Sequence, residues 1–346
     1  MNGTNESTPR RRAIRIAAAV VVVIAFGTIT AIRLRSSAPI ARPLGIARAV
    51  PQSPSFVDGA WYWVEQLENE ALLVRATDAR RELVRGRSIP SYAVAGHHLL
   101  WADQQPDGFR LSTATPDGSG TRVIRETDGR IMGAWTDGAA SAWLEQSKRP
   151  GSASRVLPPL GARCRVLLQK GDEQSVAAEL LEEFETGEVL GFRSGVLYVL
   201  GIRAEGLRAS VIYRIKPGEP PQRIVGETGV ISAVLDRATL YWTAPSRESN
   251  STMTECVRAL ATDTLKIDTI ADWLPGGGRL CLSGTDLLLL SPSENAPWLV
   301  DHPHRLGSPL ALPPDEYCIG AGEGRLLTVR RRKTPGRVAV SEVLLP

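Results

Sequence analysis

A short, mostly apolar extended segment recurs along most of the chain, and this repeat constrains the fold more than any other feature. Its best copy is Leu240-Tyr241-Trp242-Thr243-Ala244, and each copy follows a turn-forming residue and a short apolar run. The third residues of the seven copies are Trp63, Trp101, Trp143, Val199, Trp242, Leu289 and Thr328. They lie 38 to 56 residues apart with a mean of about 44, a period typical of four-stranded propeller blades.

Each unit divides into four strands, which we call A to D in chain order. In the second unit the four strands are predicted at residues 91–95, 99–103, 109–114 and 121–125. Between C and D lies Thr115–Gly120, which contains Pro-Asp-Gly, and glycine accepts the positive φ that such hairpin turns require. Turn sequences fill the same slot in two other units, at Lys170–Glu173 and Lys216–Glu219. Three turns in register indicate a true structural repeat.

The pattern of a short apolar run, Gly or Asp, and then Leu-Tyr-Trp-Thr resembles the repeats of YWTD and TolB-like β-propellers. The resemblance covers Pro43 to the C-terminus and implies an all-β propeller of about seven four-stranded blades. Six or eight blades are alternatives, because the last two copies lack aromatic residues. Ala244 stands where the YWTD motif has its acidic residue, so the resemblance carries over the fold and no functional residue. The competing interpretation is a β-sandwich, or two smaller β-domains, with accidental periodicity.

The N-terminal segment is predicted to anchor the chain in a membrane. Ile16–Ile32 carries no charge, and 17 helical residues span about 26 Å, enough for a bilayer core of ~30 Å when the flanking arginines snorkel. The arginines before this run outnumber the pair directly after it, which keeps the N-terminus in the cytoplasm. A signal peptide cleaved after Ser36-Ser37-Ala38 is the alternative, disfavoured by the proline that follows.

These features divide the chain into four parts. We predict a cytoplasmic basic tail at residues 1–12, a transmembrane signal-anchor helix at 13–35, a proline-rich linker at 36–45 and the β-propeller at 46–346. The last unit supplies only three obvious strands, and a closed ring leaves no exposed edge. We therefore predict that Ile46–Val50 completes the last blade as its outer strand; a plain linker is the alternative.

Two insertions indicate where a binding face lies. Ser147–Arg163 lengthens the B–C connection of the third unit, and Pro245–Thr254 lengthens that of the fifth. In propellers the B–C and D–A connections share one face, and functional sites often lie on loops held by a rigid scaffold. The predicted partner is an unknown protein or small ligand on this face. The predicted contacts in the two insertions are Arg149, Arg155, Arg247 and Glu248.

The four cysteines do not have zinc-site spacing and contain no Cys-x-x-Cys. Cys281 and Cys318 are both assigned to strand A, in adjacent units, so an oxidising compartment permits a disulfide between them. Buried free thiols are the favoured alternative. No cofactor is predicted. A calcium loop at Asp103–Gly108 is a weak alternative to a hairpin connection, because the segment lacks EF-hand ligand spacing.

No hydrolase, zinc-protease or phosphate-binding motif occurs in the sequence. The net charge is only +4, and the basic run at 330–333 has no interleaved aromatic residues, so nucleic-acid binding is not predicted. The favoured function is a membrane-anchored extracytoplasmic propeller that acts as a binding or scaffold module and not as an enzyme. The alternative is a propeller enzyme of the lactonase, glycosidase or lyase type, with its site at the mouth of the central channel. The ends of strand A look mostly apolar or small, which disfavours this alternative.

Overall fold

The computed structural model describes residues 41–147, 163–181, 184–203, 209–228, 230, 232–246, 254–291, 297–300, 304–305, 312, 315–331 and 337–345. Within these ranges the chain forms 28 β-strands joined by turns. The predicted tail, the predicted anchor at 13–35 and most of the predicted linker lie outside the described residues. No helix in the described part of the chain is long and apolar enough to cross a membrane.

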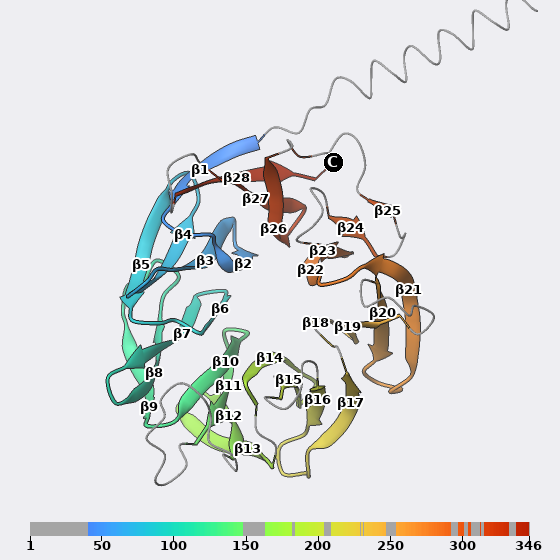
Figure 1. The fold of residues 1–346 in the computed structure, drawn as a ribbon. Coiled ribbons are helices and arrows are strands. Elements are labelled where there is room, and N and C mark those ends of the chain that lie inside the picture. Colours follow the sequence, from blue (N-terminus) through green and yellow to red (C-terminus); the bar gives the residue numbers. More distant parts are fainter. Residues whose placement is uncertain are drawn as a thin grey trace, which may run out of the picture.

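The strands form seven four-stranded antiparallel sheets arranged in a ring (Figure 1). Blades 1 to 3 consist of β2 (Gln52–Val57), β3 (Ala60–Gln66), β4 (Ala71–Ala76) and β5 (Arg80–Gly86); β6 (Ser91–Ala95), β7 (His98–Gln105), β8 (Gly108–Ala114) and β9 (Arg122–Thr127); and β10 (Arg130–Thr136), β11 (Ala140–Gln146), β12 (Cys164–Lys170) and β13 (Glu173–Leu180). Blades 4 and 5 consist of β14 (Thr186–Arg193), β15 (Val196–Ile202), β16 (Ala209–Ile215) and β17 (Gln222–Thr228); and β18 (Ala233–Asp236), β19 (Thr239–Pro245), β20 (Thr254–Ala261) and β21 (Ile267–Pro275). Blade 6 consists of β22 (Arg279–Ser283), β23 (Asp286–Leu290), β24 (Trp298–Leu299) and β25 (His304–Arg305), and blade 7 of β26 (Glu316–Gly322), β27 (Arg325–Arg331), β28 (Val338–Leu344) and β1 (Ala41–Ala47).

The predicted seven-bladed propeller is confirmed, and the blade counts of six and eight and the sandwich are wrong. In blades 1 to 6 the four strands follow one another in sequence, and in blade 7 three do, with β1 as the fourth. In every blade the first strand of this run lies nearest the centre of the ring (Figure 1). The predicted C–D turns are also found. Gly118 and Gly218 each adopt a φ of 86°, a conformation that favours glycine.

The repeat is explained by the way in which neighbouring blades pack. Seven clusters of buried apolar side chains each span two adjacent blades, so the core of the protein is the set of seven blade interfaces. Trp63, Trp143 and Trp242 are fully buried and lie at the interface between their own blade and the preceding one. A large flat ring fills this wedge-shaped space, which is why five of the seven copies of the repeat carry an aromatic residue.

The ring is closed by β1, which pairs antiparallel with β28 as the outermost strand of blade 7. The predicted role of this segment is therefore confirmed, but its predicted bounds at Ile46–Val50 are wrong by several residues. The strand runs through Pro43, which the sequence reading assigned to a linker, because an outermost strand does not need the missing N–H of proline. A bulge between Pro43 and Gly45 leaves Leu44 buried and Ile46 exposed.

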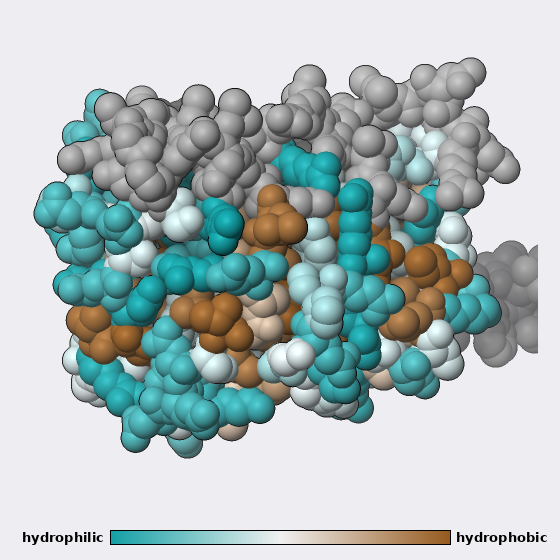
Figure 2. Space-filling view, turned by 90° about the horizontal axis from the view of Figure 1, so that it is seen from below, coloured by the Kyte–Doolittle hydropathy of each residue, from teal (hydrophilic) through white to brown (hydrophobic). Residues whose placement is uncertain are grey.

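Seen from one side, the rim of the ring is a mixed surface. Figure 2 shows apolar side chains in small separate areas among polar ones. Exposed apolar residues such as Val176 and Leu181 occur along and just after β13. Scattered apolar exposure of this kind is ordinary for a protein surface, so this side of the rim does not stand out as a docking patch.

Candidate functional site

The two insertions are B–C connections, as predicted. The first lies between β11 and β12, and its base is closed by the Ser147 N–H, which donates to the carbonyl of Arg163 at 3.0 Å. The second lies between β19 and β20, where the Ser246 N–H donates to the Thr254 carbonyl at 3.3 Å. The two insertions thus leave blades 3 and 5 on the same face. The predicted contacts Arg149, Arg155, Arg247 and Glu248 all lie outside the described residues.

Acidic side chains follow the central tryptophan of the repeat by two residues in blades 1 to 3. They are Glu65, Asp103 and Glu145, each at most 2% exposed. Asp103 accepts hydrogen bonds from Arg110 and Gln105, and Glu145 accepts them from Arg125, Arg165 and Thr127. Each buried carboxylate is therefore neutralised by an arginine of its own blade, which makes these groups structural.

Asp103 also begins Asp103–Gly108, the segment for which a calcium loop is the alternative to a hairpin connection. The carboxylate points to Arg110 at 3.1 Å, and the segment forms the β7–β8 hairpin. Within the described ranges, no group of three or more His, Cys, Asp or Glu side chains is placed to hold a metal ion.

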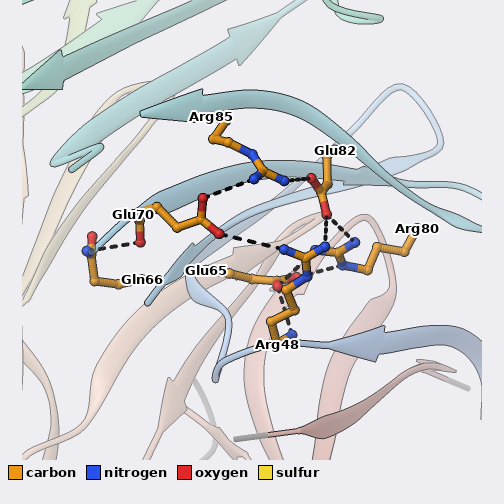
Figure 3. Close-up of polar contacts among 7 residues, drawn as sticks. All are labelled: Arg48, Glu65, Gln66, Glu70, Arg80, Glu82 and Arg85. Atoms are coloured by element: carbon orange, nitrogen blue, oxygen red, sulfur yellow. Dashed lines mark hydrogen bonds and ion pairs between the residues drawn. The ribbon is translucent and has the colours of Figure 1, made fainter. Parts of the chain in front are cut away.

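The most extensive polar network lies in blade 1 (Figure 3). Glu65 accepts two hydrogen bonds from Arg80, at 2.8 and 2.9 Å, one from the Trp63 indole at 3.0 Å, and one from the Arg48 backbone at 2.8 Å. The Arg48 side chain pairs in turn with Glu82 at 3.2 Å and with Glu70 at 3.6 Å. Because Arg48 directly follows β1, this network ties the closing strand to blade 1.

A second set of polar side chains, which we call the axial set, lies on the innermost strands of three blades. Tyr92 lies on β6, Glu188 on β14 and Arg279 on β22, which belong to blades 2, 4 and 6. The positive charge of Arg279 acts on both of the other groups and lowers the pKa of each, against burial, which raises it. These three strands are the innermost strands of their blades (Figure 1).

This axial set lies near the face that carries the insertions. Arg279, Tyr92 and Glu188 are the first, second and third residues of their innermost strands, and these strands begin at the D–A connections. The B–C connections leave the ring on that same face. The backbone of β14 at Glu188 packs directly against Gly133 of β10. A Cβ at Gly133 would lie only 2.8 Å from the Glu188 Cα, so the close approach of these two strands requires glycine.

The surroundings of Tyr92 and Glu188 differ. The Tyr92 hydroxyl lies 2.5 Å from the Ser53 carbonyl and 2.8 Å from the Tyr62 carbonyl, and burial raises its pKa, so it is a neutral phenol that donates its proton to blade 1. The Glu188 and Arg279 side chains are open to solvent, although the protein atoms around Glu188 still raise the pKa of its carboxyl. Neither has a hydrogen bond or an ion pair within the described part of the chain.

Two cysteines adjoin the axial set. Cys281 lies on β22 and Cys318 on β26, both on strand A as predicted, and both are free thiols. Burial raises the pKa of each thiol, so both are protonated at neutral pH. Cys281 lies two residues after Arg279 on β22. A disulfide between the two cysteines in an oxidising compartment stays a prediction.

Sequence reasoning missed the axial set. It took the ends of strand A as mostly apolar or small, whereas Glu188 and Arg279 are charged and lie near the starts of β14 and β22. The signal in the sequence is a single charge in a short strand that forms the inner edge of a blade. A single charge of this kind points to a functional site only once the structure shows that the strands carrying such charges surround one axis.

Comparison with known proteins identifies the fold. No family model and no curated protein matches the sequence. Among solved structures, the acylaminoacyl peptidase of Pyrococcus horikoshii matches 90% of this chain and 54% of its own, with a TM-score of 0.59 and 11% identity. An oligogalacturonate lyase in complex with manganese matches 83% of this chain and 86% of its own, with a TM-score of 0.58 and 10% identity. The β-propeller domain of the Trilobed protease from Pyrococcus furiosus matches 89% and 97%, with a TM-score of 0.58 and 12% identity.

These likenesses show the propeller fold alone, because the identities are so low. The chain spans about half the length of the acylaminoacyl peptidase and of a prolyl endopeptidase that it also matches. The Trilobed protease domain is described as having an open velcro topology, whereas β1 pairs with β28 in this chain and closes the last blade.

The environment of Glu188 predicts a pH-dependent stability. Burial raises its pKa more than Arg279 lowers it, so the folded protein loses stability as the pH rises through the raised pKa and the carboxyl ionises. Glu188→Gln is expected to raise the melting temperature at pH 8 and to leave it unchanged below about pH 4, where the carboxyl is protonated in both states. Melting curves across this range check the result, with Glu173→Gln on the exposed start of β13 as control. An equal gain at both ends of the range contradicts the prediction.

Proposed function

We propose that this protein is a membrane-anchored, extracytoplasmic propeller that binds a partner through the face carrying its B–C and D–A connections. The observation that carries the proposal is the placement of both insertions. They occupy B–C connections of blades 3 and 5, their bases are closed by backbone hydrogen bonds, and they leave the same face of a closed ring. Long loops on a rigid scaffold are a common form of binding surface.

The distribution of carboxylates supports binding over catalysis. The acidic residues that the repeat places in blades 1 to 3 are buried and held by arginines, so they serve the fold and not a substrate. The remaining axial carboxyl, Glu188, has no acidic or histidine neighbour acting on its pKa. A hydrolytic site of the two-carboxylate kind needs such a second group.

An enzyme with its site at the mouth of the channel is the second candidate. Glu188 favours it, because a solvent-accessible carboxyl whose pKa is raised by the surrounding protein has a property of a general base or acid. A propeller lyase and several peptidases are among the structural neighbours, but at this level of identity they support only the fold.

The partner-binding proposal is tested by capture from extracytoplasmic and membrane fractions. The bait is residues 41–346, which retain β1. In the test variant residues 148–162 are replaced by a short Gly-Ser linker, with Ser147 and Arg163 kept so that the loop base is preserved. The matched control replaces the turn at 116–119, a C–D connection on the opposite face.

We expect a specific partner that is lost with the loop replacement and kept with the control. Alanine at Arg149, Arg155, Arg247 and Glu248 then tests the predicted contacts one at a time, each expected to weaken capture about tenfold if it is a central contact. Equal capture by the loop replacement and the control removes the proposal. Turnover of a carbohydrate or ester that is abolished by Glu188→Gln favours the enzyme.

A further inference from the structure

The arginines on the outer strand of blade 1 differ in how their charges are neutralised. Arg80 and Arg85 on β5 form ion pairs with glutamates of the blade 1 network (Figure 3). Arg81 of the same strand is exposed and has no hydrogen bond or ion pair within the described part of the chain. It lies directly opposite Arg75 of β4. Like charges in directly opposite positions repel, so this pair destabilises the sheet locally until an anion neutralises it.

The contacts of Arg75 place the pair at the seam between blades 1 and 2. The Arg75 Nε donates to the Tyr62 hydroxyl at 3.1 Å, and this hydroxyl donates in turn to the Pro116 carbonyl at 3.4 Å. Pro116 belongs to the C–D turn of blade 2, between β8 and β9. Directly opposite residues of neighbouring strands share one face of a sheet, so Arg81 also lies on this side of blade 1. The Nη groups of Arg75 have no partner among the residues that the structure describes.

The C–D turn borders the seam from the side of blade 2. A Cβ at Gly118 would lie 3.6 Å from the Leu83 Cδ2, so the turn also packs against β5. Asp117, between these two contact points, directs its carboxylate into its own turn. The carboxylate accepts hydrogen bonds from the hydroxyls of Thr115 and Ser119 and from the Ser119 N–H. This carboxylate therefore forms no ion pair with either arginine of the seam.

We propose that Arg75 and Arg81 bind a phosphate monoester group, either on a small soluble molecule or on the headgroup of a lipid. Arg81 is exposed and Arg75 is partly exposed, so a solute reaches both guanidinium groups from the solvent. The site goes beyond partner binding by the insertions, because it lies at the C–D turns, on the opposite face of the ring.

The two guanidinium groups select a phosphate over a carboxylate. One guanidinium binds both oxygens of a carboxylate, which leaves the second arginine without a partner. A phosphate monoester has three strong acceptor oxygens and a charge of about −1.5 to −2 at neutral pH, so it accepts from both groups and neutralises both cations. It also removes the repulsion between the two arginines, which a neutral ligand does not.

The test titrates the full-length protein by calorimetry with inorganic phosphate, glycerol 3-phosphate and acetate. Dihexanoyl phosphatidate carries the same phosphate group on a short-chain lipid and separates the two sources of the ligand. The site variants are Arg75→Gln and Arg81→Gln, and Arg237→Gln in the exposed β18–β19 turn of blade 5 is the control. Melting curves without ligand check that each variant is folded. Arg81→Gln is expected to melt at or above the wild-type temperature, because it removes a like-charge repulsion, so its loss of binding is not caused by unfolding.

We expect glycerol 3-phosphate to bind with a dissociation constant of about 1 mM or tighter, and each site variant to weaken it by at least about tenfold, the loss of one charge-assisted contact. Arg237→Gln is expected to leave the affinity within about twofold, because surface charges far from a site are screened. Asp117→Asn keeps the oxygen that accepts from Thr115 and Ser119 but removes a negative charge at the edge of the seam. It is expected to tighten binding by about two- to fivefold.

The proposal is overturned if the wild type binds neither phosphate nor glycerol 3-phosphate, if acetate binds as tightly as they do, or if the Arg75 and Arg81 variants bind like the wild type. Tighter binding of dihexanoyl phosphatidate than of glycerol 3-phosphate assigns the site to a lipid headgroup, and equal binding assigns it to a soluble phosphate. Partner capture depends on the insertions on the opposite face and is measured separately, so its failure and the failure of this site are distinguishable.

Discussion

Glu65→Ala is expected to lower the free energy of unfolding by about 3–5 kcal/mol, because it removes one partner of a buried ion pair and leaves the other without compensation. Arg80 is only 15% exposed and donates two hydrogen bonds to Glu65. The same substitution removes the acceptor of the Trp63 indole and of the Arg48 backbone (Figure 3). Four donors therefore lose their partner in one step.

Equilibrium unfolding of residues 41–346 in urea measures the effect. Glu219→Ala removes the carboxylate of an exposed ion pair with Lys216 and is expected to cost less than about 1 kcal/mol. The double variant Glu65→Met/Arg80→Met removes both charges and is expected to be more stable than Glu65→Ala alone, since no charge is then left buried. If Glu65→Ala is no less stable than Glu219→Ala, the buried Glu65–Arg80 ion pair does not stabilise blade 1.

The role of these carboxylates shows how far sequence reasoning reaches. The copies of the repeat place Glu65, Asp103 and Glu145 two residues after a tryptophan, whereas Ala244 occupies this position in blade 5. The pattern alone predicts a β-propeller, because an aromatic residue recurs in most units and fills the space between neighbouring blades. It does not identify the arginine that neutralises each acid, because that partner comes from a different strand in different blades: Arg80 in β5 and Arg110 in β8.

The axial set was beyond sequence reasoning for a different reason. Tyr92, Glu188 and Arg279 are separated by roughly two blade periods each, and no local pattern connects them. The ring alone places all three on innermost strands. The position of β1 was partly predictable, since the last unit lacked a strand, but its bounds were not. A proline-rich segment gives little alternation, and the bulge at Leu44 shifts the remaining pattern by one residue.

Leu44→Ala is the second substitution with a large expected effect, and it tests ring closure directly. Leu44 is 1% exposed and packs in the cluster that joins blade 7 to blade 1. Truncation of a buried leucine costs about 2–5 kcal/mol, depending on how far the cavity collapses. Ile46 lies two residues further along the same strand and is 40% exposed, so Ile46→Ala is expected to cost less than about 1 kcal/mol.

The comparison of these two variants separates a closing strand from a passive linker. If β1 is a passive linker that adds no stability to blade 7, Leu44→Ala and Ile46→Ala have similar small effects on the urea midpoint. If β1 completes blade 7, removal of residues 41–47 is more damaging than either. It deletes six residues paired with β28, the salt bridge of Arg42 to the buried Glu342, and the cover over Val338 and Val340. A loss of that size approaches the whole stability of a domain, about 5–15 kcal/mol. A bait for partner capture that starts after β1 is then expected to unfold.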